Sequence, residues 1–264
     1  MQLLQLSMEK EFIGQIALVT GAGSGIGRAT ARQLAANGAQ VAIVGRRAAA
    51  LAEVAAEAAL TGGVMWPLAV DLTDREAAAT LVPRTLERFG GMDILVNAAG
   101  LISTGTIADT SETAWQEMME LNLHSVFRLI QQAVPALAER RGNVVNVSSV
   151  TGLRAFPGVL AYCVSKAALD QLTRCASLEL AAQGVRVNAV NPGVVVTGLH
   201  RTSGMSEEKY AGFLEHSRTT HPLGRVGTAA EVADLICFLA SARAGWITGA
   251  TYAIDGGRAN TCAR

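Results

Sequence analysis

The stretch TGAGSGIGR, residues 20–28, decides the fold of this chain. It directly follows the β-branched run IALVT at 16–20 and opens a stretch whose apolar residues have helical spacing. Gly21 permits a tight turn, Gly25 lets the backbone approach a diphosphate, and Gly27 lets the helix lie close to the sheet. Free N–H groups at the helix N-terminus bind phosphate oxygens. Its place between strand and helix favours a nucleotide-binding turn over an ordinary glycine-rich turn.

The rest of the chain alternates short apolar runs with alanine-rich stretches of helical spacing. The runs are IALVT (16–20), VAIVG (41–45), VMWPLAV (64–70), DILVN (93–97), NVVNVSS (143–149), VRVNAVNPG (185–193) and TYAID (251–255). The helical stretches are 26–37, 48–60, 74–89, 112–139 and 160–182. Apolar runs without polar alternation are typical of strands covered on both faces. This order predicts an α/β fold, a Rossmann-type doubly wound parallel sheet flanked by helices.

No linker, internal repeat or low-complexity tract separates these segments, which predicts a single dinucleotide-binding and catalytic domain over residues 1–264. One segment, GLHRTSGMSEEKYAGFLEHSRTTHPLG at 198–224, is polar and longer than an ordinary connection. Long connections of this kind are often lids or specificity loops. We therefore expect an irregular substrate-loop insertion around 198–224.

Composition excludes several classes of protein. Half of the 264 residues are apolar, and the 22 basic and 22 acidic residues balance, which argues against a nucleic-acid partner. No apolar run approaches the roughly 20 residues of a membrane helix, and MQLLQLSMEKEFIG lacks the features of a secretory signal. The four cysteines show no metal-ligand spacing, so we expect reduced core thiols and no metal. These features predict a cytoplasmic protein without a membrane partner.

The end of the second apolar run, VAIVGRR, bears on the choice of nucleotide. A free ribose 2′-hydroxyl is usually held by an Asp or Glu at this point, but Arg46 and Arg47 stand here instead. A guanidinium binds a 2′-phosphate through forked, charge-assisted hydrogen bonds, whereas a carboxylate would repel it. The sequence predicts a preference for NADP(H), with Arg46 as the main contact and NAD(H) as the alternative. Solvated arginines at a helix start are the competing interpretation.

The stretch AYCVSKAAL, residues 161–169, places Tyr162 and Lys166 one helical turn apart on the same face. A nearby ammonium favours the phenolate, so we expect Lys166 to lower the pKa of Tyr162. A tyrosine with a lowered pKa exchanges protons nearer neutral pH. By itself such a pair is usually a surface contact.

Several motifs accompany the pair in a fixed order. They are the glycine turn, NAAG at 97–100, LNL around Asn122, NVSS ending at Ser149, the Tyr162–Lys166 pair, and NPGVVVT at 191–197. Together they resemble the short-chain dehydrogenase/reductase family in its shorter soluble branch, from about residue 12 to 258. The C-terminal stretch from PLGRVG onward resembles that of 3-oxoacyl-thioester reductases and of sugar or polyol dehydrogenases in this family.

The resemblance implies a catalytic tetrad of Asn122, Ser149, Tyr162 and Lys166. Tyr162 would be the acid in carbonyl reduction and the base in alcohol oxidation, and Ser149, rather than Ser148, would hydrogen-bond the reacting oxygen. Lys166 would bind the nicotinamide ribose, and Asn122 would hold a water that relays protons from the lysine to solvent. Hydride chemistry belongs to the cofactor, and the protein places the substrate carbonyl beside it.

The resemblance also implies which residues contact the cofactor. The glycine turn contributes Gly21, Ser24, Gly25, Ile26 and Gly27; Arg46 and Arg47 follow the second strand; Asp71 and Leu72 lie by the adenine; Asn97, Ala98 and Gly100 lie along the ribose; Pro192, Gly193, Val195 and Thr197, with Tyr162 and Lys166, lie at the nicotinamide end. Pocket walls are expected from Leu101, Phe156, Leu199 and Met205. A structural role is favoured for His124. His200 and His221 flank the segment 198–224 and could touch the substrate, but solvated positions are favoured for both.

The leading hypothesis is an NADP(H)-dependent oxidoreductase that interconverts a ketone and a secondary alcohol. The alternative is an NAD-dependent dehydrogenase of a polyol, steroid or other secondary alcohol. A non-catalytic NADP-sensing binding protein is the alternative from another class. The family also implies a homo-oligomer, commonly a homotetramer, with 112–139 and 160–182 as candidate contacts between subunits.

Overall fold

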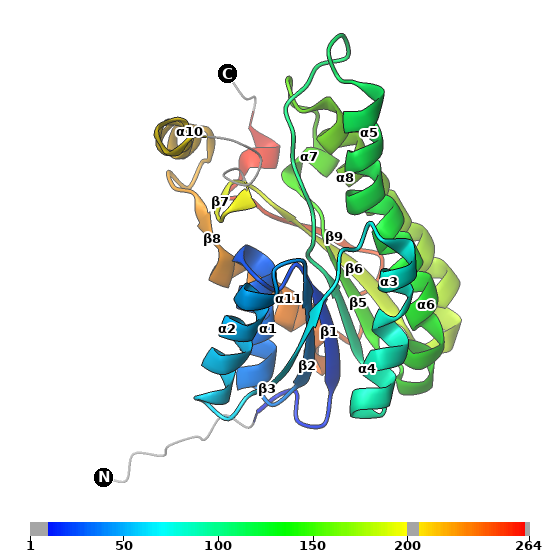
Figure 1. Cartoon of the computed structure of the whole chain (residues 1–264). Coiled ribbons are helices and arrows are strands. Elements are labelled where there is room, and N and C mark those ends of the chain that lie inside the picture. Colours follow the sequence, from blue (N-terminus) through cyan, green and yellow to red (C-terminus); the bar gives the residue numbers. More distant parts are fainter. Residues whose placement is uncertain (1–9, 200–205, 262–264) are drawn as a thin grey trace.

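The computed structural model describes residues 10–199 and 206–261 and contains a seven-stranded parallel sheet (Figure 1). Its strand order is β3-β2-β1-β4-β5-β6-β9. The strands are β1 (Ile16–Thr20), β2 (Gln40–Gly45), β3 (Val64–Ala69), β4 (Ile94–Asn97), β5 (Asn143–Val147), β6 (Arg186–Pro192) and β9 (Thr251–Ile254). Each predicted apolar run coincides with one of them to within a few residues at the ends, and the predicted α/β fold is confirmed.

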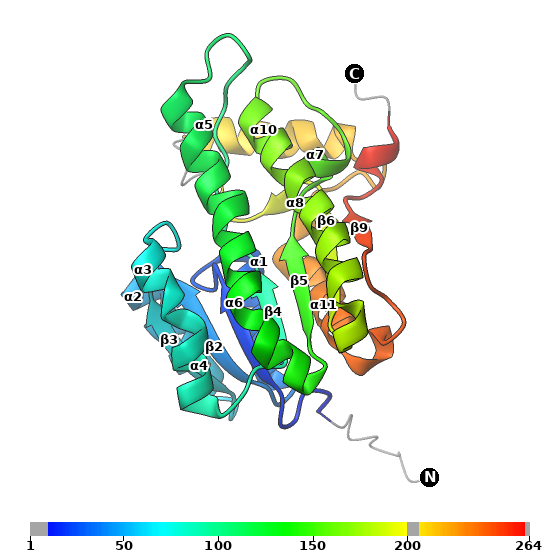
Figure 2. The ribbon, with the colours of Figure 1, turned by 90° about the vertical axis from the view of Figure 1, so that its right-hand side faces the viewer.

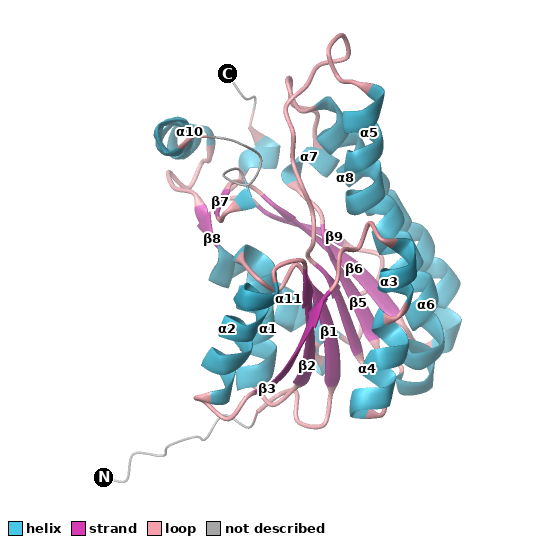
Figure 3. Ribbon diagram, in the orientation of Figure 1, coloured by secondary structure: helices cyan, strands magenta, loops and turns pink. Residues whose placement is uncertain are grey.

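Helices cover both faces of the sheet, as the layers in Figure 3 show. One face carries α1 (Gly25–Ala36), α2 (Ala48–Ala59) and α11 (Ala229–Ala240). The other carries α3 (Arg75–Ala79), α4 (Leu81–Phe89), α6 (Ser125–Arg140) and α8 (Leu160–Leu180). α5 (Glu112–Met119) lies beyond the sheet and packs against α8. Side chains of β1 alternate between the two cores: Ala17 and Val19 pack toward α1 and α11, and Leu18 packs toward α4 and α6. Both faces are therefore apolar, which explains the uninterrupted apolar runs.

The order of the strands creates the crevice in which ligands of such folds bind. β1 pairs with β2 on one side and with β4 on the other, so the winding of the chain reverses there. Ligands of open α/β sheets lie beyond the carboxyl ends of the strands at this reversal. The glycine turn follows β1 at that edge.

The stretch predicted as one helix over 112–139 is interrupted. A π-helical turn, η1 (Glu120–His124), connects α5 to α6, and Figure 2 shows both running beside α8. A π turn inside an α-helix frequently marks a functional site. Here η1 carries Asn122.

The prediction of an irregular segment at 198–224 is wrong for most of its length. It contains α10 (Glu207–Thr220), which lies above the sheet in Figure 1. The signals were present, because the Ser206 side chain accepts a hydrogen bond from the Lys209 N–H as an N-cap. Glu207 and Glu208 also stand in the first turn, where the helix dipole favours acidic residues. His200 and Met205 lie outside the described residues.

The described cysteines do not all fit the prediction of core thiols. Cys163 and Cys237 are buried, and burial raises the pKa of Cys237 to about 12. Cys175 is exposed on α8, and Cys262 lies outside the described residues. In the part of the chain that the structure describes, no helix is both long enough and apolar enough to cross a membrane.

Candidate active site

A cavity of about 950 Å³ lies at the carboxyl ends of the strands. Nearly all of the predicted cofactor contacts line it: Gly21, Ser24, Gly25, Ile26, Gly27, Arg46, Arg47, Asp71, Leu72, Ala98, Gly100, Pro192, Gly193, Val195 and Thr197. Ser149, Tyr162 and Lys166 line the same cavity, as do Leu101, Phe156 and Leu199. The fold thus brings the nucleotide-binding turn and the Tyr–Lys pair to one space.

The glycine turn leaves no room for side chains at its two ends. Gly21 has a φ of +66°, and a Cβ there would lie 2.7 Å from the carbonyl oxygen of Ala98. A Cβ on Gly27 would lie 2.5 Å from the carbonyl oxygen of Gly21. Since the obstacles are backbone atoms, the turn closes only with glycine at both positions.

The N-terminus of α1 is open to a ligand. Ser24 is its N-cap residue, yet in the described chain its side chain makes no capping hydrogen bond. The first N–H groups of a helix have no partner within the helix, and together with the dipole they favour an anion. The turn therefore fits the diphosphate of a dinucleotide.

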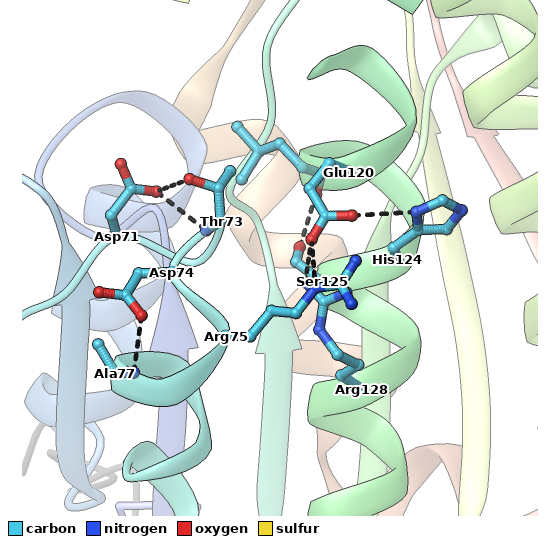
Figure 4. A network of polar contacts seen from close by, with 10 residues as sticks. Asp71, Thr73, Asp74, Arg75, Ala77, Glu120, His124, Ser125 and Arg128 are labelled. Atoms are coloured by element: carbon cyan, nitrogen blue, oxygen red, sulfur yellow. Dashed lines mark hydrogen bonds and ion pairs between the residues drawn. The ribbon is translucent and has the colours of Figure 1, made fainter. Parts of the chain in front are cut away.

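The far end of this nucleotide region holds two arginines and one carboxylate. Arg46 and Arg47 are exposed beyond β2, and no described carboxylate pairs with either of them. Asp71 follows β3, the strand next to β2 in the sheet. Its carboxylate is held by Thr73, because Oδ1 accepts hydrogen bonds from Thr73 N (3.0 Å) and Oγ1 (2.8 Å), as Figure 4 shows. The buried side chain of Leu72 follows it along the cavity wall.

Tyr162 is buried in the wall of the cavity, with 7 % of its surface exposed. Burial raises its pKa to about 12, and a hydrogen bond with the Ser149 side chain acts in the opposite direction. Ser149 lines the cavity with Tyr162, whereas the Oγ of its neighbour Ser148 donates to the carbonyl oxygen of Lys166 (3.2 Å).

Lys166 lies next to the tyrosine, but it does not lower the tyrosine's pKa. Its Nζ is 5.7 Å from the centroid of the Tyr162 ring and donates to the carbonyl oxygen of Val147 (2.9 Å). Burial lowers the pKa of Lys166 itself to about 8, against the attraction of Asp170. The predicted direction for Tyr162 is therefore wrong in this structure, because burial of the tyrosine, which disfavours the phenolate, has the largest effect on its pKa.

The Asn122 side chain connects the loop after β4 to α8 through hydrogen bonds. Its Oδ1 accepts from Leu101 N (2.9 Å), and its Nδ2 donates to Leu101 O (3.0 Å) and to Ser165 Oγ (3.1 Å). The side chain is fully buried and does not line the cavity. A Cβ on Gly100 would lie 3.2 Å from Asn122 Oδ1 and 3.6 Å from Lys166 Nζ, so this glycine leaves space beside the ammonium.

The π turn that carries Asn122 is anchored from outside by Glu120 (Figure 4). The Glu120 carboxylate accepts from Arg128 (2.6 Å), contacts Arg75 (3.6 Å) and pairs with His124 Nδ1 (3.1 Å). Hydrogen bonds and charge interactions with these groups lower the pKa of Glu120 despite its burial. His124 is thus exposed and bound to Glu120, which agrees with the expected structural role.

Asn97 does not lie in the cavity, although it was predicted to contact the cofactor. Its Nδ2 donates to Asn146 Oδ1 (2.9 Å), and Asn146 Nδ2 donates to Thr173 Oγ1 (2.9 Å). All three side chains are buried. These hydrogen bonds connect β4 and β5 to α8, so the Asn97 side chain stabilises the strands that carry the site.

The residues of the cavity wall that were missed or misjudged from the sequence include three with ionisable side chains: His221, Lys209 and Arg258. His221 was expected in solvent, but it is 3 % exposed, its Nε2 accepts from Val194 N (3.1 Å), and its Nδ1 lies 2.6 Å from Ser217 O. The ring joins the end of α10 to the loop after β6. Nothing in the sequence indicated a buried ring at this position.

The chain is similar to known proteins over nearly its full length. A family model described as Enoyl-(Acyl carrier protein) reductase matches residues 21–259. The 3-oxoacyl-[acyl-carrier-protein] reductases of Thermotoga maritima and Haemophilus influenzae are 36% and 37% identical to it, over 92% of this chain and 97% and 98% of theirs. A trans-4-hydroxycyclohexanecarboxylate dehydrogenase of Sinomonas cyclohexanicum is 35% identical over 92% of both chains. A solved short-chain dehydrogenase/reductase of unknown function from Caenorhabditis elegans, with cofactor, superimposes with a TM-score of 0.90 at 34% identity, over 95% of this chain and 97% of the other.

Proposed function

The chain belongs to the short-chain dehydrogenase/reductase family of NAD(P)-dependent oxidoreductases acting on CH–OH and carbonyl groups, and we propose that it interconverts a ketone and a secondary alcohol with NADP(H) as its preferred cofactor. The observation that carries the proposal is the position of Tyr162. Its side chain is buried in the wall of the cavity, which Ser149 also lines and which the glycine turn closes at the nucleotide end. Asn122, Ser149, Tyr162 and Lys166 are the proposed catalytic tetrad.

In the proposed reduction, Tyr162 gives its proton to the carbonyl oxygen. A bound nicotinamide cofactor supplies the hydride to the carbonyl carbon in reduction and takes it back in oxidation. Because the pKa of Tyr162 is raised to about 12, the hydroxyl keeps its proton at neutral pH and serves as an acid. Ser149 holds the substrate oxygen next to it, and Lys166 fixes the ribose at the nicotinamide end.

The preference for NADP(H) rests on the end of β2. Arg46 and Arg47 line the cavity there, and residues 45–47 include no carboxylate that would repel a 2′-phosphate. The N-terminus of α1 and the turn around Gly21 would hold the diphosphate. The cofactor contacts predicted from the sequence, except Asn97, belong to this proposal.

The proposal is tested with purified protein, NADPH, NADH and their oxidised forms on a panel of ketones and secondary alcohols. The expected result is turnover of at least one ketone, with kcat/KM higher for NADPH than for NADH. Preference for NADH would overturn the assignment of the cofactor. Tight binding of NADPH without turnover of any ketone would instead support the non-catalytic sensing protein.

The relatives' names bear on the class of substrate. Two of them act on 3-oxoacyl-[acyl-carrier-protein], and one acts on a ring alcohol that carries a carboxylate. We place both in the substrate panel, as a 3-oxoacyl thioester and a cyclic oxo acid. Polyols and steroids test the NAD-dependent alternative.

We also propose that the protein forms a homotetramer and works in the cytoplasm. Phe127 on α6 and Val164 and Leu178 on α8 are exposed, with Leu178 at 80%. These are the two helices expected to contact another subunit, and apolar exposure on them supports a second copy of the chain as the partner. Light scattering that finds a monomer at micromolar concentration would contradict it.

A further inference from the structure

Arg258 is one of two cations of the cavity wall, with Lys209, to which the proposed function assigns no part. It begins the short helix η4 (Arg258–Asn260) after β9, and it lines the cavity together with Tyr162 and Phe156. Its Cζ lies 5.2 Å from the centroid of the Phe156 ring, and its Nη1 donates to the carbonyl oxygen of Thr220 (3.1 Å). An aromatic platform and the end of α10 therefore fix where the guanidinium lies.

The segment that carries Arg258 is held independently of its side chain. The Asp255 carboxylate accepts from the N–H groups of Gly257 (2.9 Å) and Ala259 (2.6 Å), so this nearest acid is used to cap η4. Arg154 donates to the carbonyl oxygens of Ala259 (3.0 Å) and Thr261. The backbone of η4 is thus anchored on both sides.

The guanidinium of Arg258 has unused donors. Its Nε and Nη2 make no hydrogen bond to any residue that the structure describes, and none of the described carboxylates forms an ion pair with it. Burial and the nearby Arg154 lower its pKa. A partly buried cation beside a second cation is costly unless an anion accompanies it.

The cavity as a whole is positive although the chain is neutral. Its lining includes Arg46, Arg47, Lys166, Lys209 and Arg258 but one carboxylate, Asp71. In the proposed function, the first three cations bind the cofactor, and Asp71 belongs to the nucleotide end. Lys209 on α10 and Arg258 remain for the substrate.

We propose that Arg258 binds a carboxylate of the substrate, so that the preferred ketone is a small oxo acid. The inference rests on the proposed function, because it names the substrate class of that site. The free Nε and Nη2 edge presents the forked donor pair that matches a carboxylate. Phe156, Leu101 and Leu199 supply apolar walls for the carbon skeleton. The cavity of about 950 Å³ must also hold the dinucleotide, which leaves space for a small molecule.

The test compares ketones that share the reacting carbonyl and ring but carry either an ionised carboxylate or its neutral ester. 4-Oxocyclohexanecarboxylate and its methyl ester present the same ketone with and without the anion, and the readout is the ratio of their kcat/KM values with NADPH. We expect wild-type protein to favour the acid by about 10- to 100-fold, the range of a charge-assisted hydrogen bond. Arg258→Met should bring the ratio to about one, and Arg258→Lys, which keeps the charge and loses the fork, should give an intermediate ratio.

Arg84→Met is the matched control, because Arg84 also lies over an aromatic ring, 5.4 Å from that of Trp66, and does not line the cavity. It should keep the wild-type ratio. Wild-type protein that reduces the acid and the ester equally well overturns the inference and leaves the proposed function standing. Failure to reduce either compound or any other ketone overturns the proposed function itself.

A second pair separates the carboxylate from another source of negative charge. The 3-oxobutanoyl thioesters of coenzyme A and of N-acetylcysteamine carry the same ketone with and without phosphates. We expect Arg258→Met to change the ratio of kcat/KM values for this pair by less than about threefold, which is the effect of losing a hydrogen bond between uncharged groups. A loss confined to the coenzyme A thioester would overturn the assignment to a carboxylate.

Discussion

The two ends of the cavity are built from different parts of the chain. The nucleotide end is shaped by backbone, since Gly21 and Gly27 pack against carbonyl groups and the open N-terminus of α1 offers N–H groups. The substrate end is shaped by side chains from α10, η4 and the loop around Phe156. A site formed by backbone tolerates almost no substitution, whereas a site formed by side chains changes its chemistry with a single substitution. The nucleotide end is therefore informative about the protein family, and the substrate end is informative about the substrate.

Tyr162 stands where the two ends meet, and its loss should have the largest effect. Tyr162→Phe removes the proton donor, so we expect kcat for ketone reduction to fall by about 10²- to 10⁴-fold. NADPH binding, measured by fluorescence titration, should stay within a few fold, because the glycine turn is untouched. Turnover at the wild-type rate would show that another group moves the proton.

The raised pKa of Tyr162 predicts a pH dependence that differs between the two directions. With a pKa of about 12, the protonated acid persists at neutral pH, while the ionised base increases about tenfold per pH unit. We expect kcat/KM for alcohol oxidation to rise steeply from pH 7 to 9, and kcat/KM for reduction to stay nearly flat below the pKa of Lys166, about 8. An oxidation rate that is flat in this range would show a tyrosine that is already ionised below pH 7.

The nucleotide end offers a matched pair of glycines for the next prediction. Gly27→Ala places a Cβ 2.5 Å from a backbone oxygen, and we expect it to destabilise the fold by about 1–3 kcal/mol and to weaken NADPH binding. Gly23→Ala is the control, because the nearest atoms to a Cβ there are side-chain carbons at 3.6 and 3.8 Å. Thermal unfolding and NADPH titration measure both effects. Equal losses in the two variants would contradict the account of the turn as closed by close backbone contacts.

The same contrast explains how far the sequence could predict this molecule. Strand runs, the glycine turn, and the Tyr162–Lys166 spacing are local patterns, and each corresponds to an element or contact that the structure has. The rest depends on contacts between distant segments. His221 contacts Val194, and Arg258 contacts Phe156. Such contacts form only when α10 and η4 fold back over the loops after β5 and β6, and no local pattern encodes them.

The direction of the Tyr162 pKa failed for a related reason. The spacing of Tyr162 and Lys166 revealed the nearby charge, but the burial of Tyr162 depends on α5, the loop after β4 and the loop before α8. The side chain of a strand-end asparagine can point into the cavity or into the core, and the sequence does not decide between the two for Asn97. Here Asn146 and Thr173 complete a buried chain of hydrogen bonds with it.

Arg46 tests whether a side chain alone sets the specificity of the nucleotide end. Arg46→Asp replaces a cation with a carboxylate that would repel a 2′-phosphate, and we expect kcat/KM with NADPH to fall by about 10- to 100-fold. kcat/KM with NADH should rise or hold, because a carboxylate can accept from the free 2′-hydroxyl. Unchanged values with both cofactors would mean that Arg46 is a solvated surface residue. Steady-state kinetics with both cofactors decide this.

His221 should have the smallest effect, and it sharpens the contrast at the substrate end. His221→Leu leaves the Val194 N–H without its acceptor, and a buried donor without a partner costs about 1–3 kcal/mol. His216→Leu is the control on the same helix, because its side chain is exposed. We expect a lower Tm and a higher KM for the ketone in His221→Leu alone, because the loop after β6 lines the cavity. A change in Tm without a change in KM would limit His221 to a structural role, and the end of α10 would then have no part in holding the substrate.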